Sequence, residues 1–113
     1  MQKFFIQSQD RHGSCYHEFY QGTWDRKKMV FWHKESICIS DYNFNMTGLA
    51  KLIAEIIPEY DPYGMTIVTR KDWDMIAERA AATGGELADA VTEANEWTKQ
   101  NFRRHKVFTI VGL

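Results

Sequence analysis

The fold is decided by residues 86–113, ELADAVTEANEWTKQNFRRHKVFTIVGL, where an amphipathic helical pattern runs into an apolar strand. At about 100° per residue, one side of this helix collects apolar or small side chains and the other collects polar ones, mostly acids. The first side holds Leu87, Val91, Ala94, Thr98 and Phe102, and the second holds Glu86, Asp89, Glu93, Glu96 and Gln100. Residues 107–111 are apolar on both pleat faces except at Thr109, which predicts a strand inside a sheet. The C-terminal end is therefore expected to be part of the core.

The polar side of this helix contains no Lys or Arg. Neighbouring like charges at i,i+3 or i,i+4 each cost roughly 0.2–0.5 kcal/mol of helix stability. We therefore expect the acidic stripe to have a role outside folding. Charge reversal at Asp89 and Glu93 is expected to leave the free protein folded, or slightly stabilised.

Length and composition predict one ordered domain over residues 1–113. A hydrophobic content of 44% with 14% aromatic residues excludes disorder. No signal peptide and no apolar stretch long enough to span a membrane are apparent, which predicts a cytoplasmic protein. Cys15 and Cys38 stand in no zinc-binding pattern, so free thiols are expected, with a disulfide between them as the alternative. No cofactor is predicted.

Charge is distributed unevenly along the chain. From Glu55 to Glu96 there are ten acids and three bases, a net of −7, whereas the remainder has five acids and eleven bases, a net of +6. Segregation of this kind concerns encounter and partner choice more than folding.

Four strand patterns precede the first predicted helix. They cover residues 3–8, 15–20, 29–32 and 37–40. The first two are expected to pair as a hairpin, and the last two are expected to pair across Lys34-Glu35.

Three helices and two further strands are predicted after them. The first helix starts near Thr47 and ends before Pro58, and a strand follows at 65–68. The spacings Thr69-x-x-Asp72 and Thr83-x-x-Glu86 predict capping boxes for the second helix and for the long helix. The order indicates an α+β fold, with a largely antiparallel sheet of about five or six strands and about three helices on one face.

The densest group of reactive residue types is His12, Cys15, His17 and Glu18. A cysteine nucleophile needs a histidine that holds it as a thiolate, but Cys15 and His17 on a strand merely share a face. A metal site from His12, Cys15 and His17 lacks a fourth ligand at a familiar spacing. We predict no catalytic or metal site. A small enzyme or ligand-binding domain that uses His17, Glu18 or Cys15 remains the alternative.

The basic run Arg26-Lys27-Lys28 beside Trp24 is the one candidate for nucleic-acid binding. Three bases in a protein of pI about 6.4 fall short of the charge expected for that function, so direct nucleic-acid binding is not predicted. Membrane binding is not predicted either.

The segments EANEWTKQNF at 93–102 and FTIVGL at 108–113, together with the acidic helical block, resemble immunity proteins of bacterial toxin–immunity systems. Those of contact-dependent growth inhibition are the most similar in character. The resemblance implies a small cytoplasmic α+β protein, a monomer until it binds a cognate toxin domain, which is often a basic nuclease. It implies neutralisation by occlusion of the toxin active site or an adjacent surface, and it carries over no individual binding residue.

An acidic surface is the fitting complement of a basic toxin. The residues expected to contact it are acids of the second and third helices, with two aromatic anchors nearby. They are Asp72, Asp74, Glu78, Glu86, Asp89, Glu93 and Glu96, with Tyr60 and Tyr63.

Overall fold

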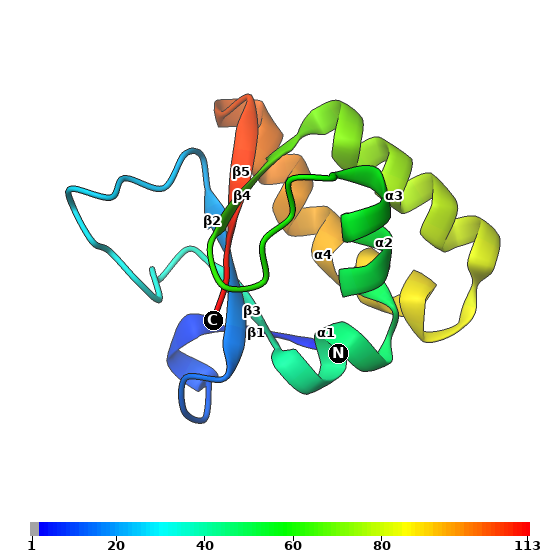
Figure 1. Ribbon diagram of the computed structural model, residues 1–113, viewed down its shortest axis with the longest axis horizontal. Helices are drawn as coiled ribbons and strands as arrows, with labels where there is room; N and C mark the ends of the chain where they lie inside the picture. Colours follow the sequence, from blue (N-terminus) through cyan, green and yellow to red (C-terminus); the bar gives the residue numbers. More distant parts are fainter. Residues whose placement is uncertain (1–2) are drawn as a thin grey trace.

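The computed structural model describes residues 3–113 and has four α-helices on one face of a five-stranded antiparallel sheet (Figure 1). The predicted α+β architecture is confirmed. The strands are β1 (Phe5–Gln7), β2 (Tyr16–Gln21), β3 (Ile37–Ser40), β4 (Met65–Thr69) and β5 (Val107–Val111). The helices are α1 (Asp41–Met46), α2 (Leu49–Ile56), α3 (Arg70–Thr83) and α4 (Gly85–Arg104), and a 3-10 turn, η1, covers Ser8–Asp10. The strand order is β1-β3-β2-β5-β4.

The C-terminal strand lies inside the sheet, as the apolar pattern predicts. β5 pairs with β2 on one side, with Phe19 opposite Ile110, and with β4 on the other, with Val68 opposite Phe108. Beyond it, the amide of Gly112 donates to the carbonyl of Gly64 at 2.7 Å. A Cβ at Gly112 would lie 2.4 Å from the carbonyl oxygen of Pro62, so this close approach requires glycine.

Both predicted hairpins are wrong. β1 pairs with β3 rather than β2, and β2 pairs with β3 across the connection 22–36. The alternation of side chains identifies a strand but does not choose its neighbour, because several neighbours satisfy the same pattern. Here the register places Phe5 opposite Ile39, so that the two side chains face the helices together.

The strand predicted at 29–32 is also wrong, because this segment is part of a loop on the outer side of the sheet, opposite the helices (Figure 1). Met29 and Trp32 have φ values of 50° and 58°, which extended strands do not contain. Side-chain hydrogen bonds hold the loop instead. The indole of Trp24 donates to the carbonyl of Val30 at 2.7 Å, and the carboxylate of Glu18 accepts from the amide of Trp32 at 2.8 Å.

The helical predictions are largely confirmed, with α1 as an additional short helix whose first turn is capped by Ser40. The capping box at the start of α3 is present, with Thr69 and Asp72 each accepting the other's amide. The capping box predicted for α4 is wrong. Gly84 precedes α4 with φ 74° and no side-chain cap, and the hydroxyl of Thr83 donates to the carbonyl of Arg79.

The core lies between the sheet and the helices, with Phe19 at its centre. The ring of Phe19 is 5.1 Å from that of Phe5 and 5.2 Å from that of Phe108, and it also meets the rings of Trp73 and Trp97. On α4 the buried residues include Val91, Ala94 and Thr98, while Leu87 and Phe102 are half-buried against the core. The apolar side predicted for the long helix is therefore the side that packs.

Candidate binding surface on α3 and α4

The seven acids expected to contact a partner differ in what the structure does with them. Asp74, Glu78, Glu86, Asp89 and Glu96 are exposed, whereas Asp72 and Glu93 are half-buried. All seven belong to the α3–α4 pair, but three of them already have partners within the chain.

Glu93 is an internal hydrogen-bond acceptor. Its carboxylate accepts from the amides of Lys3 at 2.8 Å, Phe4 at 2.8 Å and Phe5 at 3.0 Å, and so fastens the start of the edge strand β1 to α4. The expectation that charge reversal here leaves folding untouched is therefore wrong, because a cationic side chain cannot accept these bonds. No local sequence pattern predicts that Glu93 accepts these bonds, because the donor amides lie about 90 residues away in the sequence.

Asp72 and Glu86 have weaker internal roles. Asp72 accepts the amide of Thr69 in the capping box of α3. Glu86 lies 3.7 Å from the ammonium of Lys3, and both side chains are more than half exposed, so the pair contributes about 0–1 kcal/mol.

Four of the seven predicted acids are exposed and have no base within ion-pair distance among residues 3–113. They are Asp74, Glu78, Asp89 and Glu96. They occupy the solvent side of two packed helices, where a partner has access to them.

The two predicted aromatic anchors belong to the connection between α2 and β4. Tyr63 is exposed, whereas Tyr60 is half-buried with its ring 6.3 Å from that of Phe44. Burial, with Asp41 and Asp61 nearby, raises the pKa of Tyr60 to about 12. Within the described part of the chain, no hydrogen bond, ring contact or pocket joins either tyrosine to the acids of α3 and α4.

The residues of the enzyme alternative do not converge. His17 and Glu18 are consecutive in β2 and point to opposite faces of the sheet. His17 is buried beside Phe44, with its Nε2 2.8 Å from a carboxylate oxygen of Asp41. Glu18 is buried under the outer loop, and Cys15 is an exposed thiol. These three side chains thus form no common site.

Cys38 is the second free thiol, and it is buried. Burial raises its pKa to about 11 against the weaker opposite effect of a hydrogen bond with Ser8, so the thiol stays protonated and unreactive at neutral pH. Across residues 3–113 there is no cluster of potential metal ligands, and no helix is long and apolar enough to cross a membrane.

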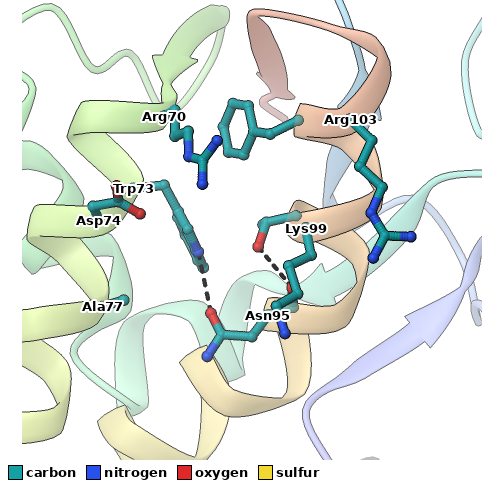
Figure 2. A pocket seen from close by; sticks show the side chains of 9 residues that line it. Arg70, Trp73, Asp74, Ala77, Asn95, Lys99 and Arg103 are labelled. Atoms are coloured by element: carbon teal, nitrogen blue, oxygen red, sulfur yellow. Dashed lines mark hydrogen bonds between the residues drawn. The ribbon is translucent and has the colours of Figure 1, made fainter.

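A groove of about 460 Å³ separates the N-terminal half of α3 from the C-terminal half of α4 (Figure 2). Its lining combines three bases with an acid, two polar residues and three apolar ones. They are Arg70, Lys99, Arg103, Asp74, Asn95, Thr98, Trp73, Ala77 and Phe102. The sequence does not predict this groove, because its bases come from two helices whose packing is not encoded in a local pattern.

Polar contacts across the groove set the orientation of one side chain. The indole of Trp73 on α3 donates to the amide oxygen of Asn95 on α4 at 3.2 Å (Figure 2). This bond directs the amide oxygen of Asn95 toward Trp73 and leaves the amide nitrogen of Asn95 as a donor. Comparison of the chain with protein-family models, with curated proteins and with solved structures gives no match.

Proposed function

We propose that this protein is an immunity protein, which binds a cognate bacterial toxin domain through the exposed carboxylates of α3 and α4 and neutralises it by covering its active site or an adjacent surface. The observation that carries the proposal is that four exposed acids of the adjacent helices α3 and α4, namely Asp74, Glu78, Asp89 and Glu96, have no base within ion-pair distance among residues 3–113. Exposed carboxylates without an internal base are available to a basic partner such as a nuclease domain.

The helices that carry these acids are held firmly in place. α3 packs through Trp73 and Ile76, and α4 through Ala90, Val91 and Ala94, against the same core. A rigid arrangement of charges reduces the ordering that binding requires. It also concentrates negative potential on one surface, which accelerates encounter with a basic partner by 10-fold or more at low salt.

The test is binding of Asp89→Lys/Glu96→Lys to the toxin domain encoded beside this gene. Both residues are exposed and neither has an internal charge partner among residues 3–113, so the variant is expected to stay folded. The association rate should fall by about tenfold at low salt, and the difference from the parent should shrink as salt increases.

A matched control is Asp10→Lys/Glu35→Lys, which makes the same change in net charge at two exposed acids outside α3 and α4. Its association rate should stay near that of the parent, and cells that carry it should still be protected from the toxin. Equal association rates for both double variants, or a flat salt dependence of the parent, would contradict the assignment of this surface. Absence of any binding to the neighbouring toxin would contradict the immunity function itself.

A further inference from the structure

We propose that the groove between α3 and α4 binds a small organic phosphate, with Arg70, Lys99 and Arg103 around the phosphate group. Of the four acids proposed to contact the toxin, only Asp74 also lines this groove, and the proposal does not depend on the toxin proposal. It would give the protein a small-molecule ligand in addition to a protein partner.

The three bases lack internal acids. Arg70 is the first residue of α3, and Lys99 and Arg103 lie one turn apart on α4. Among residues 3–113, none of the three is within 4.0 Å of a carboxylate oxygen. Figure 2 shows Arg70 reaching from α3 toward α4, with Lys99 and Arg103 on the facing helix. Two arginines and a lysine that line one groove suit a phosphate group, whose oxygens accept paired N–H donors from arginine.

Asn95 adds a neutral donor to this set. Its amide oxygen accepts from Trp73, and the described part of the chain offers its amide nitrogen no acceptor. The hydrogen-bonding groups at the α4 side of the groove are therefore mainly donors. A ligand that presents several acceptor oxygens satisfies them, which an uncharged apolar molecule does not.

The rest of the lining indicates that the ligand has an organic part. Trp73, Ala77 and Phe102 contribute carbon surface beside the bases. A volume of about 460 Å³ lies in the range of small-molecule sites and leaves room beyond a phosphate group. An apolar or aromatic portion of the ligand would remove this carbon surface from water.

Asp74 refines the choice of ligand. Its carboxylate lines the same groove and repels a phosphate group placed close to it, while it accepts hydrogen bonds from hydroxyl or amino groups. The favoured ligand thus carries phosphate at one end and hydrogen-bond donors at the other. A nucleoside monophosphate has this chemistry, and AMP is a suitable probe.

The test is calorimetric titration of the full chain with AMP, inorganic phosphate and adenosine. AMP should bind at one site, phosphate should bind at least tenfold more weakly, and adenosine should show no binding. Arg70→Gln and Arg103→Gln should each weaken AMP binding by about tenfold, because each removes charge-assisted hydrogen bonds. Asp74→Asn should keep or strengthen it.

The sequence supplies a matched control for each arginine. Lys71→Gln and Arg104→Gln remove the same charge at the adjacent residue, which is exposed and does not line the groove. These controls should bind AMP within about twofold of the parent, and urea titration should show that all variants are folded. Asp89→Lys/Glu96→Lys should also bind AMP normally, which separates this result from the toxin experiment.

Several results would overturn the proposal. One is the absence of saturable AMP binding, and another is binding of adenosine as tightly as AMP. Equal loss in Arg70→Gln and Lys71→Gln would show that net charge rather than the groove is responsible. Binding of a Glu-rich peptide, without binding of AMP, would show that the groove accepts an acidic protein segment instead.

Discussion

The sequence predicts helices within residues 70–104 and a strand at 29–32 within the segment 22–36, and only the helices are present. The helical region repeats its apolar residues over two helices, and those residues form the buried faces of α3 and α4. The segment 22–36 contains one short apolar run, Met29–Trp32, and forms a loop. An apolar pattern repeated over several turns specifies the helices. A run of four apolar residues forms too few contacts to impose a strand where hydrogen bonds to Glu18 favour a loop.

The two regions also differ in whether a carboxylate binds the region or belongs to it. The outer loop is held to β2 by Glu18, whose carboxylate accepts hydrogen bonds from the amides of Trp32 at 2.8 Å and His33 at 2.9 Å. α4 instead contains the acceptor, Glu93, which holds the start of β1. Both Glu18 and Glu93 are therefore structural residues, because each accepts hydrogen bonds from backbone amides.

The largest effect is expected from removal of residues 107–113, because both regions depend on β5. Phe108 packs under α4 on one face, and the hydroxyl of Thr109 on the other face donates to Gly22 at 2.9 Å and accepts from the amide of Trp24 at 3.1 Å. The loss should be several times the roughly 1.5–3 kcal/mol of one large buried side chain. The shortened chain should show no cooperative thermal transition in far-UV circular dichroism. Retention of a transition near that of the full chain would contradict the central role of β5.

Much of the fold could be predicted from the sequence, because it depends on patterns that act locally. The buried positions of β5 and α4 and the turn at residues 61–64 follow from periodicity and from turn residues. The neighbour of β1 could not be predicted, since it depends on Glu93 and on packing far along the chain. The groove could not be predicted for the same reason, because Arg70 and Lys99 line one groove only as a result of the packing of α3 on α4.

The next largest effect is expected for Glu18→Ala. The substitution leaves the amides of Trp32 and His33 without their acceptor, which should lower the free energy of unfolding by about 2–3 kcal/mol. Urea denaturation measures the loss, and hydrogen exchange should accelerate at these two amides before global unfolding. Glu35→Ala, at an exposed acid of the same segment, should change stability by less than about 0.5 kcal/mol. Slow exchange at both amides in Glu18→Ala would contradict the role of Glu18 in holding this part of the loop.

A smaller effect on stability is expected for Glu93, the acid of α4 that accepts backbone hydrogen bonds, than for Glu18, and almost none for the exposed Glu96. Glu93→Gln keeps an acceptor oxygen but loses the charge that three amides share, so the free energy of unfolding should fall by about 1–2 kcal/mol. Glu96→Gln should change the free energy of unfolding by less than about 0.5 kcal/mol, because Glu96 is exposed and its hydrogen bond from Gln100 is long, at 3.5 Å. Equal urea midpoints for the two variants would show that the interaction of Glu93 with β1 contributes little in solution.

The smallest effect concerns two threonines that precede helices at the same spacing from an acid. Thr69 caps α3, accepting from the amide of Asp72 at 3.1 Å, whereas the hydroxyl of Thr83 bonds back to Arg79 within α3. Thr69→Ala should therefore cost about 1 kcal/mol, and Thr83→Ala only a few tenths, as measured by urea denaturation. The reason for the difference is that Thr83 is the last residue of α3, and Gly84, with φ of 74°, is the residue that precedes α4. Equal losses in the two variants would indicate that Thr83 caps α4 in solution, and that the sequence pattern identified both helix starts correctly.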